Sequence, residues 1–278
     1  MADQLDPRTV PIKPAATVML LRDPDGGGPG MEVFMLRRTG RATFAAGMYV
    51  FPGGRVDDID HATEIEPFCD GMTDADASAQ LGIESGGLAF WVAAIRECFE
   101  EAGILLAAPR DGSSLHLADD ERHAVHDGTL SMVELCQRHD LVLDLSTTQY
   151  VDHWITPMGE QRRFDTRFFV TDAPDGQAGM HDDKETVESA WVRPSEALAQ
   201  FEAGELQMMP PTVANLRWLD GFETADEAVA AGAALTDIRR IVPRLKRDGE
   251  GRIVGVARPG DEDYDSIEVD DPVLSAWG

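Results

Sequence analysis

The stretch from Ser85 to Gly103 constrains the fold of this chain more than any other segment. Apolar side chains recur in it at steps of four, three and four residues, namely Trp91, Ile95, Cys98 and Ala102. This period lines them up on one face of an α-helix and predicts that the helix packs against a core. Ser85 stands where an N-cap residue is expected, and Gly103 suits the left-handed residue that follows a last helical turn.

Three glutamates share another face of the same predicted helix. Glu97, Glu100 and Glu101 stand at i, i+3 and i+4, which makes them neighbours on the helix surface. Like charges at this spacing destabilise a bare helix by roughly 0.2–0.5 kcal/mol per pair. A divalent cation such as Mg²⁺ prefers carboxylate oxygens and would remove the repulsion. Arg96, four residues before Glu100, is placed to hold that carboxylate; a solvated acidic face is the alternative interpretation.

The charge of the chain limits its partners. The 278 residues include 51 acidic and 24 basic ones, for a net charge of −27. Such a surface repels nucleic acids and anionic membranes, so we expect neither as a partner. A small polyanion can still bind where metal and a few arginines offset the field. The composition leaves the oligomeric state open, with a homodimer as one alternative.

Cysteine usage and the ends of the chain favour a cytoplasmic protein. Cys69, Cys98 and Cys136 form no CxxC pair, which predicts reduced thiols. The first residues contain neither a basic nor an apolar region of a signal peptide, and no run of 18 or more apolar residues exists. The histidines show no spacing typical of metal ligands, so we interpret them as structural or surface residues.

The remaining periodicities predict a mixture of strands and helices. Strands are expected at Ala15–Arg22, Met31–Arg38, Tyr49–Phe51, Ile104–Leu106, Gln149–Thr156, Phe164–Thr171 and Val187–Val192. Helices are expected within 117–139 and at Pro194–Ala203, Pro211–Asp220 and Ala225–Ala234. Pro52-Gly53-Gly54 is typical of a turn, and residues 55–85 of a loop or short helices. This order of elements predicts an α/β sandwich.

The run from Arg96 to Ile104, Arg-Glu-Cys-Phe-Glu-Glu-Ala-Gly-Ile, resembles the second half of the signature of Nudix hydrolases. The first half of the signature is a glycine followed six residues later by a glutamate. Here Gly54 matches the glycine, and Asp60 stands in the place of the glutamate. Between Asp60 and Arg96 lie 35 residues, 28 more than the signature has. The peroxisomal coenzyme A diphosphatases of the superfamily have a comparable insertion, flanked by similar segments.

The resemblance implies a fold and a division of the chain. We expect the Nudix α/β/α sandwich with a mixed central sheet over residues 1–220, with an insertion at about 61–85. Residues 221–278 are expected to be a helical extension packed on that domain.

The resemblance also implies an activity: metal-dependent hydrolysis of a diphosphate, with coenzyme A or an acyl-coenzyme A as the preferred substrate. Glu97, Glu100, Glu101 and the carbonyl of Gly54 would bind Mg²⁺ or Mn²⁺. Arg96 would orient Glu100, and Glu97 or a later carboxylate would be the base. Glu188 is the first choice for that later carboxylate, and Glu185 the second.

The upstream pattern of the coenzyme A branch is present in part. Arg38-Thr39, Gly47 and Phe51-Pro-Gly-Gly match it, whereas Thr43 stands where an arginine is expected and Arg41 is a substitute two residues earlier. Arg38, Arg41 and Gly53 would therefore contact the substrate. Two alternatives remain: hydrolysis of another nucleoside diphosphate such as ADP-ribose or a dinucleotide, and a catalytically silent Nudix module that senses a nucleotide.

Overall fold

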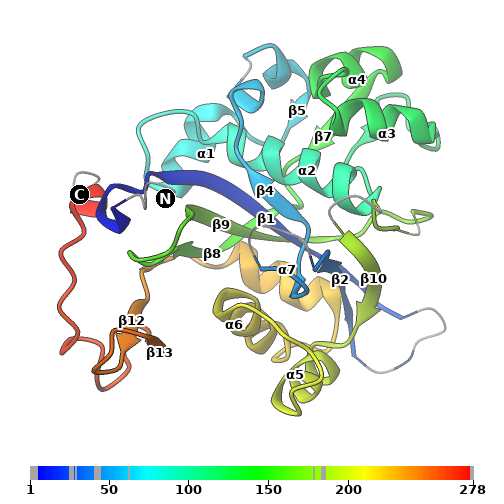
Figure 1. Cartoon of the computed structure of the whole chain (residues 1–278). Coiled ribbons are helices and arrows are strands. Elements are labelled where there is room, and N and C mark those ends of the chain that lie inside the picture. The colour runs from blue at the N-terminus through cyan, green and yellow to red at the C-terminus, as the bar shows by residue number, and fades with distance from the viewer. Residues whose placement is uncertain are drawn as a thin grey trace.

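The fold is a mixed β-sheet covered by helices on both faces (Figure 1). The computed structural model describes residues 6–24, 28, 30–40, 45–61, 63–177, 179–182 and 186–275. Arg41, Thr43 and Glu185, which carried predictions, lie outside the described residues.

The central sheet has eight strands in the order β10-β2-β1-β9-β8-β11, with β3 beside β2 and β4 beside β1. Its strands are β1 (Ile12–Arg22), β2 (Glu32–Arg38), β3 (Tyr49–Val50), β4 (Gly53–Arg55), β8 (Gln149–Ile155), β9 (Arg163–Asp172), β10 (Thr186–Val192) and β11 (Arg240–Ile241). β1 runs parallel to β9 and β11 parallel to β8, while the other neighbours are antiparallel. The sheet is therefore mixed, as the sequence predicts.

Helices form the two outer layers. The α-helices are α1 (Asp74–Leu81), α2 (Leu88–Ala102), α3 (Asp119–His126), α4 (Met132–His139), α5 (Pro194–Glu202), α6 (Pro210–Leu219), α7 (Ala225–Ala233) and α8 (Pro272–Ser275). α1 to α4 lie over one face of the sheet and α5 to α7 over the other (Figure 1). Each face has its own apolar core. The predicted α/β/α sandwich is confirmed.

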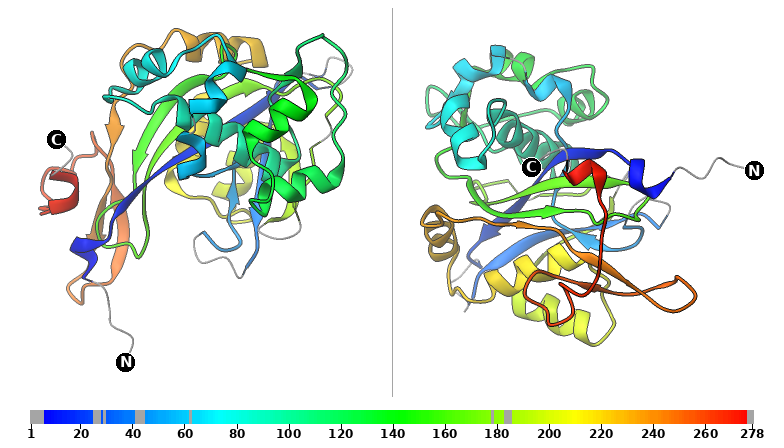
Figure 2. Two further views of the ribbon diagram at one scale, coloured as in Figure 1. Left: turned by 90° about the horizontal axis from the view of Figure 1, so that it is seen from above. Right: turned by 90° about the vertical axis from the view of Figure 1, so that its left-hand side faces the viewer.

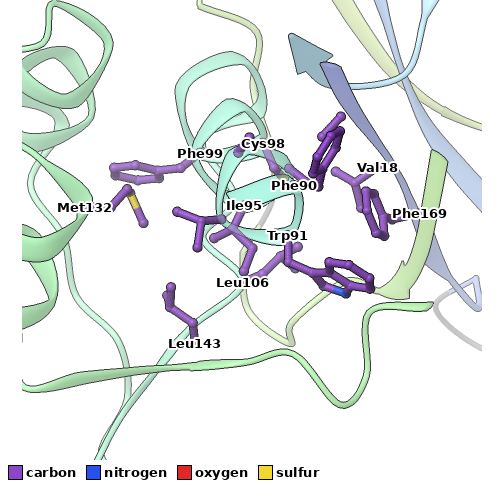
Figure 3. Close-up of a cluster of buried hydrophobic side chains, with 14 of the residues drawn as sticks. Val18, Phe90, Trp91, Ile95, Cys98, Phe99, Leu106, Met132, Leu143 and Phe169 are labelled. Carbon is purple, nitrogen blue, oxygen red and sulfur yellow. The ribbon is translucent and has the colours of Figure 1, made fainter. Parts of the chain in front are cut away.

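α2 is the central helix of the first layer. Trp91 contacts Phe169 of the sheet, with ring centroids 4.7 Å apart, while Phe99 points to the opposite side near Met132 (Figure 3). The helix ends at Gly103, whose φ of 68° is left-handed, as predicted. The expected cap at Ser85 is wrong.

The start of α2 depends on a residue outside the helix. Gly87 precedes its first residue without a side-chain cap. The Asp74 carboxylate accepts the backbone N–H groups of Leu88 and Gly86, both at 3.0 Å. A side chain from α1 therefore satisfies donors that a local cap would otherwise take.

The inserted region is folded. It contains the 3₁₀ helices η2 (Asp58–His61) and η3 (Thr63–Phe68), then β5 (Cys69–Asp70) and α1. β5 pairs in parallel with β7 (Leu141–Asp144), which also pairs with β6 (Ala108–Pro109). The prediction of short helices is confirmed. Because β5 and β7 are far apart in sequence, local patterns could not predict their pairing.

Two local predictions were wrong. Gly53–Arg55 is a strand and not a turn, because β4 pairs with β1 through Ala16 opposite Gly54. Residues 104–106 form no strand. The Gln177 side chain instead bonds both backbone groups of Leu105, at 2.8 and 3.0 Å, and so replaces a strand partner.

The segment after residue 220 is only partly the helical extension that was expected, because α7 is followed by β11 of the central sheet, a hairpin and a returning strap. After β11, the strands β12 (Arg244–Arg247) and β13 (Ile253–Ala257) form the hairpin. The chain then runs back to α8 beside the N-terminal segment η1 (Pro7–Thr9) (Figure 2).

No helix among the described residues is long and apolar enough to span a membrane. Cys69, Cys98 and Cys136 are free thiols, as predicted. Burial raises the pKa of Cys69 and Cys136 to about 12.

Candidate active site

Arg96 organises the glutamates of α2. Its Nη1 atom donates to Glu97 Oε1 at 2.8 Å and to Glu100 Oε1 at 3.1 Å. The predicted contact between Arg96 and Glu100 is thus present. Arg96 is 7% exposed and Glu100 8%, so the interaction is shielded from water and both side chains are held in place.

Asp60 holds the other side of the same guanidinium. Its two carboxylate oxygens accept from Nε and Nη2 of Arg96, both at 2.8 Å, and Nη2 also donates to the Arg55 carbonyl at 2.9 Å. Asp60 is 2% exposed, and a bidentate pair of this kind defines the orientation of the arginine. The fold therefore brings Asp60 to Arg96 across the insertion. This arrangement identifies Asp60 as a positioning residue.

Glu101 reaches the first residue of β4. Its Oε2 accepts the backbone N–H of Gly53 at 3.0 Å, and its Oε1 lies 3.9 Å from Nη1 of Arg38. A Cβ at Gly53 would lie 2.5 Å from the Ala16 carbonyl oxygen, and the φ of Gly53 is +157°. Glycine is required there because the backbones approach closely.

Gly54 faces Glu97 directly. A Cβ at Gly54 would lie 2.5 Å from the carboxylate carbon of Glu97. Burial raises the pKa of Glu97 to about 7 despite the nearby positive charge of Arg96. Burial likewise raises the pKa of Glu100. The cluster is therefore short of positive charge when all its carboxylates are ionised.

The glutamates line one end of a cavity of about 620 Å³. The charged lining residues at this end are Arg38, Arg55, Asp57, Arg96, Glu97, Glu100 and Glu101. Apolar residues from β8, β9, α6 and the C-terminal hairpin line another part: Trp154, Ile155, Phe164, Phe168, Met209, Pro210, Pro211, Pro243, Leu245 and Val256. A cavity of this volume is large enough for a ligand with a charged group and a sizeable apolar part.

Several cavity residues were not predicted from the sequence, and two of them lie beside the Arg96 cluster. His126 lines the cavity from the end of α3, and its Nδ1 lies 3.7 Å from Glu100 Oε2. Asp57 also lines it, with its Oδ2 3.9 Å from Nη2 of Arg96. Neither has a local pattern that separates it from surface residues, because both depend on how distant segments pack on α2.

Glu188 lies away from this cluster. It pairs with Arg37 across β10 and β2, with 3.4 Å between Oε2 and Nη1. Successive side chains of a strand point to opposite faces, so Arg37 and Glu188 face the layer of α5 and α6 while Arg38 faces Glu101. Glu188 is absent from the cavity lining, and its placement does not support the predicted role as base.

The donors around Glu97 suit a divalent cation. In the described part of the chain, no three His, Cys, Asp or Glu side chains already converge as a metal site, since Arg96 lies between Glu97 and Glu100. The three glutamates nevertheless line the same cavity, and the carboxylate of Glu97 lies against the Gly54 backbone, with Oε1 2.5 Å from where a Cβ would be. Hard oxygen donors with a shortage of positive charge fit Mg²⁺ or Mn²⁺.

Known proteins with similar sequences point to one family. A family model described as the NUDT19 Nudix domain matches residues 70–219. The acyl-coenzyme A diphosphatase NUDT19 of Gallus gallus is 30% identical over 94% of this chain and 82% of that protein. The human protein of the same name is 28% identical over 84% of this chain and 72% of that protein.

A solved structure agrees with the fold. The crystal structure of a Nudix hydrolase from Alicyclobacillus acidocaldarius superimposes with a TM-score of 0.68 and 26% identity, covering 80% of this chain and 97% of that one.

Proposed function

Because this chain belongs to the Nudix hydrolase family, within the group matched by the NUDT19 Nudix domain, we propose that it hydrolyses the diphosphate bond of coenzyme A or an acyl-coenzyme A. The observation that carries the proposal is the cluster of buried Arg96, Glu100 and Glu101 with half-buried Glu97, which together line a large cavity. The names of the relatives in chicken and human support the substrate class. The products would be a phosphopantetheine compound and adenosine 3′,5′-bisphosphate.

Each residue of the cluster has a proposed role. Glu97, Glu100, Glu101 and the Gly54 carbonyl would hold Mg²⁺ or Mn²⁺, which would neutralise the phosphates and lower the pKa of the attacking water. Arg96, held by Asp60, keeps the carboxylates of Glu97 and Glu100 in place. Glu97 is our choice of base, because it lines the cavity and its carboxylate lies against the Gly54 backbone, beside the proposed metal position.

Arg38 and Gly53 would orient the substrate. Arg38 lines the cavity beside Glu101, and a guanidinium is a planar donor that matches phosphate oxygens. Arg41 keeps its predicted contact as a proposal. A cytoplasmic location, a homodimer and the division at residue 220 also stay predictions.

The proposal is tested with the full chain and a panel of diphosphates. Activity should vanish in chelator and return with Mg²⁺ or Mn²⁺. Coenzyme A should exceed ADP-ribose in kcat/KM by at least about tenfold, worth ~1.4 kcal/mol. Arg38→Ala should remove much of that margin. Better turnover of ADP-ribose or a dinucleotide would contradict the substrate, and full turnover in verified absence of metal would contradict the mechanism.

The carboxylates are tested separately from the fold. Glu100→Gln and Glu101→Gln should each lower kcat by about a hundredfold or more, ~2.7 kcal/mol, and leave the melting temperature unchanged or slightly higher. Glu202→Gln, at an exposed position of α5, is the matched control. Unchanged rates with raised stability would contradict a role of these carboxylates in catalysis, and tight nucleotide binding without turnover in the unmodified chain would favour a sensor.

A further inference from the structure

The C-terminal hairpin of β12 and β13 contributes directly to the cavity that holds the glutamate cluster. Pro243, Leu245 and Val256 are among the lining residues. Leu245 and Val256 are directly paired across the hairpin, so their side chains lie on the same face of it. These residues are more than 140 positions after Glu100 in the sequence, yet they close the same cavity.

The hairpin is held against the rest of the cavity wall. A Cβ at Gly159, in the loop between β8 and β9, would lie 3.1 Å from Cδ1 of Leu245 and 2.8 Å from Nη2 of Arg247. The strap after the hairpin is tied to the sheet where Arg163 forms a bidentate pair with Asp271, Nη1 to Oδ1 being 3.0 Å. The hairpin thus contacts the loop between β8 and β9, and the strap is tied back to the hairpin where Arg244 Nη1 donates to the carbonyls of Tyr264 and Ile267 at 2.7 and 2.9 Å.

The chemistry of this wall differs from that of the glutamate end. Leu245 and Val256 line the same cavity as other apolar residues, among them Phe164, Phe168 and Pro211. The loop between β8 and β9 adds Glu160 and Arg162, whose opposite charges give no net attraction for a phosphate. A hydrocarbon chain suits such a wall, because its transfer from water gains free energy in proportion to the apolar area buried.

We propose that the hairpin forms the subsite for the acyl arm of the substrate. This inference rests on the proposed function: the diphosphate lies at the glutamates, and the thioester-linked hydrocarbon chain extends along Leu245 and Val256. The hairpin then selects acyl-coenzyme A over free coenzyme A. Each fully buried methylene should raise kcat/KM by up to about fourfold.

The test compares chain length between matched variants of the full protein with Mg²⁺. The substrates are coenzyme A and its acetyl, hexanoyl and dodecanoyl thioesters, with ADP-ribose as a diphosphate without an acyl arm. In the unmodified protein kcat/KM should rise with chain length. A Leu245→Ala/Val256→Ala double variant should lose about tenfold on dodecanoyl-coenzyme A and stay within about twofold on coenzyme A and ADP-ribose. Val254→Ala, on the same strand with 64% exposure, should leave the whole series unchanged.

A second variant and a binding measurement distinguish loss of acyl-chain recognition from loss of folding. Val256→Phe fills the wall and should shift the preferred acyl chain to a shorter one. Affinity for dodecanoyl-coenzyme A, measured in chelator without turnover, should fall about tenfold in the double variant, while affinity for coenzyme A stays within about twofold. Equal losses on all substrates, or no change on any, would overturn the inference. If ADP-ribose is cleaved and no coenzyme A compound is, the proposed function itself fails.

Discussion

Gly54 and Glu97 show how closely single residues define the site. The backbone of β4 passes so near the Glu97 carboxylate that only a hydrogen fits between them. The same carboxylate is held by Arg96 at 2.8 Å. The position of the Glu97 carboxylate therefore depends both on the lack of a side chain at Gly54 and on the side chain of Arg96.

Gly54→Ala should separate activity from stability. The new Cβ would lie 2.5 Å from the Glu97 carboxylate, and the flexible end of that side chain can move away at little cost to folding. We expect kcat to fall at least about tenfold, ~1.4 kcal/mol, with a melting temperature within a few degrees of the parent. The control is Gly249→Ala, where a Cβ meets nothing within 4 Å. Equal activity of the two variants would show that the close approach of Gly54 to Glu97 is not needed for activity.

The titration of Glu97 predicts how metal binding depends on pH. Its pKa is raised by burial from 4.5 to about 7, so the folded chain keeps a proton that the unfolded chain releases. Without metal, stability from this group is therefore present below pH 4.5 and decreases as pH rises toward 7. A metal ion requires the ionised form, so its affinity should rise by up to about tenfold per pH unit below 7.

The measurement is the increase in melting temperature that Mn²⁺ produces at several pH values between 5.5 and 8.5. The increase should grow up to about pH 7 and then level off. Glu97→Gln removes the titrating group, so the Mn²⁺-induced increase in melting temperature should change less with pH over the same range. A metal effect that is equal at pH 5.5 and 8.5 would show that Glu97 does not compete with protons for the ion.

At the scale of elements, packing determines where the helices and strands begin and what they contact. α2 begins with help from Asp74 of α1, and β10 determines the placement of Glu188 through its pairing with β2. The C-terminal strap ends at α8, where Asp271 Oδ1 also accepts the N–H of Leu274 at 3.1 Å. One buried ion pair therefore anchors the last element to β9.

Asp271→Asn should release this anchor. Arg163 is 1% exposed and Asp271 6%, and removal of one partner from a buried pair leaves an uncompensated charge that costs about 3–5 kcal/mol. Chemical denaturation should show this loss, and limited proteolysis should cleave earlier near residue 265. Asp237→Asn breaks the exposed pair with Arg239 (N–O 3.0 Å) and should cost less than about 1 kcal/mol. Similar losses in the two variants would contradict the anchoring role.

At the scale of the whole molecule, charge is distributed unevenly. The chain carries −27, yet seven of its 24 basic residues lie between 239 and 258, beside only two acidic ones. This segment includes the hairpin that lines the cavity. The long-range field still repels a polyanion, so binding depends on contacts inside the cavity and not on steering.

Raising the ionic strength from a low value should therefore increase the activity. The screening length shortens from about 30 Å at 0.01 M to about 8 Å at 0.15 M, which reduces the repulsion between the acidic surface and the substrate. With metal kept saturating, kcat/KM for coenzyme A should rise a few-fold over this range. The less charged ADP-ribose should respond less, and a fall in kcat/KM with salt would show that the basic segment attracts the substrate at long range.

The sequence by itself determined the helix of Glu97, Glu100 and Glu101, the ending at Gly103 and the family. These features are local: helical spacing, a left-handed glycine and a contiguous signature are all contained within one segment. It also predicted the contact of Arg96 with Glu100, since i and i+4 are neighbours on any helix.

Only the tertiary structure decided which distant groups join that helix. Asp60 reaches Arg96 because the 3₁₀ helix η2 packs against α2, although 35 residues separate the two side chains in the sequence. Glu188 faces away because strand register, which no local pattern specifies here, determines the side to which it points. Leu245 and Val256 line the cavity because the hairpin packs against the loop between β8 and β9 at Gly159. Each of these contacts depends on packing between segments far apart in the chain, whereas sequence periodicity reports only the geometry within one element.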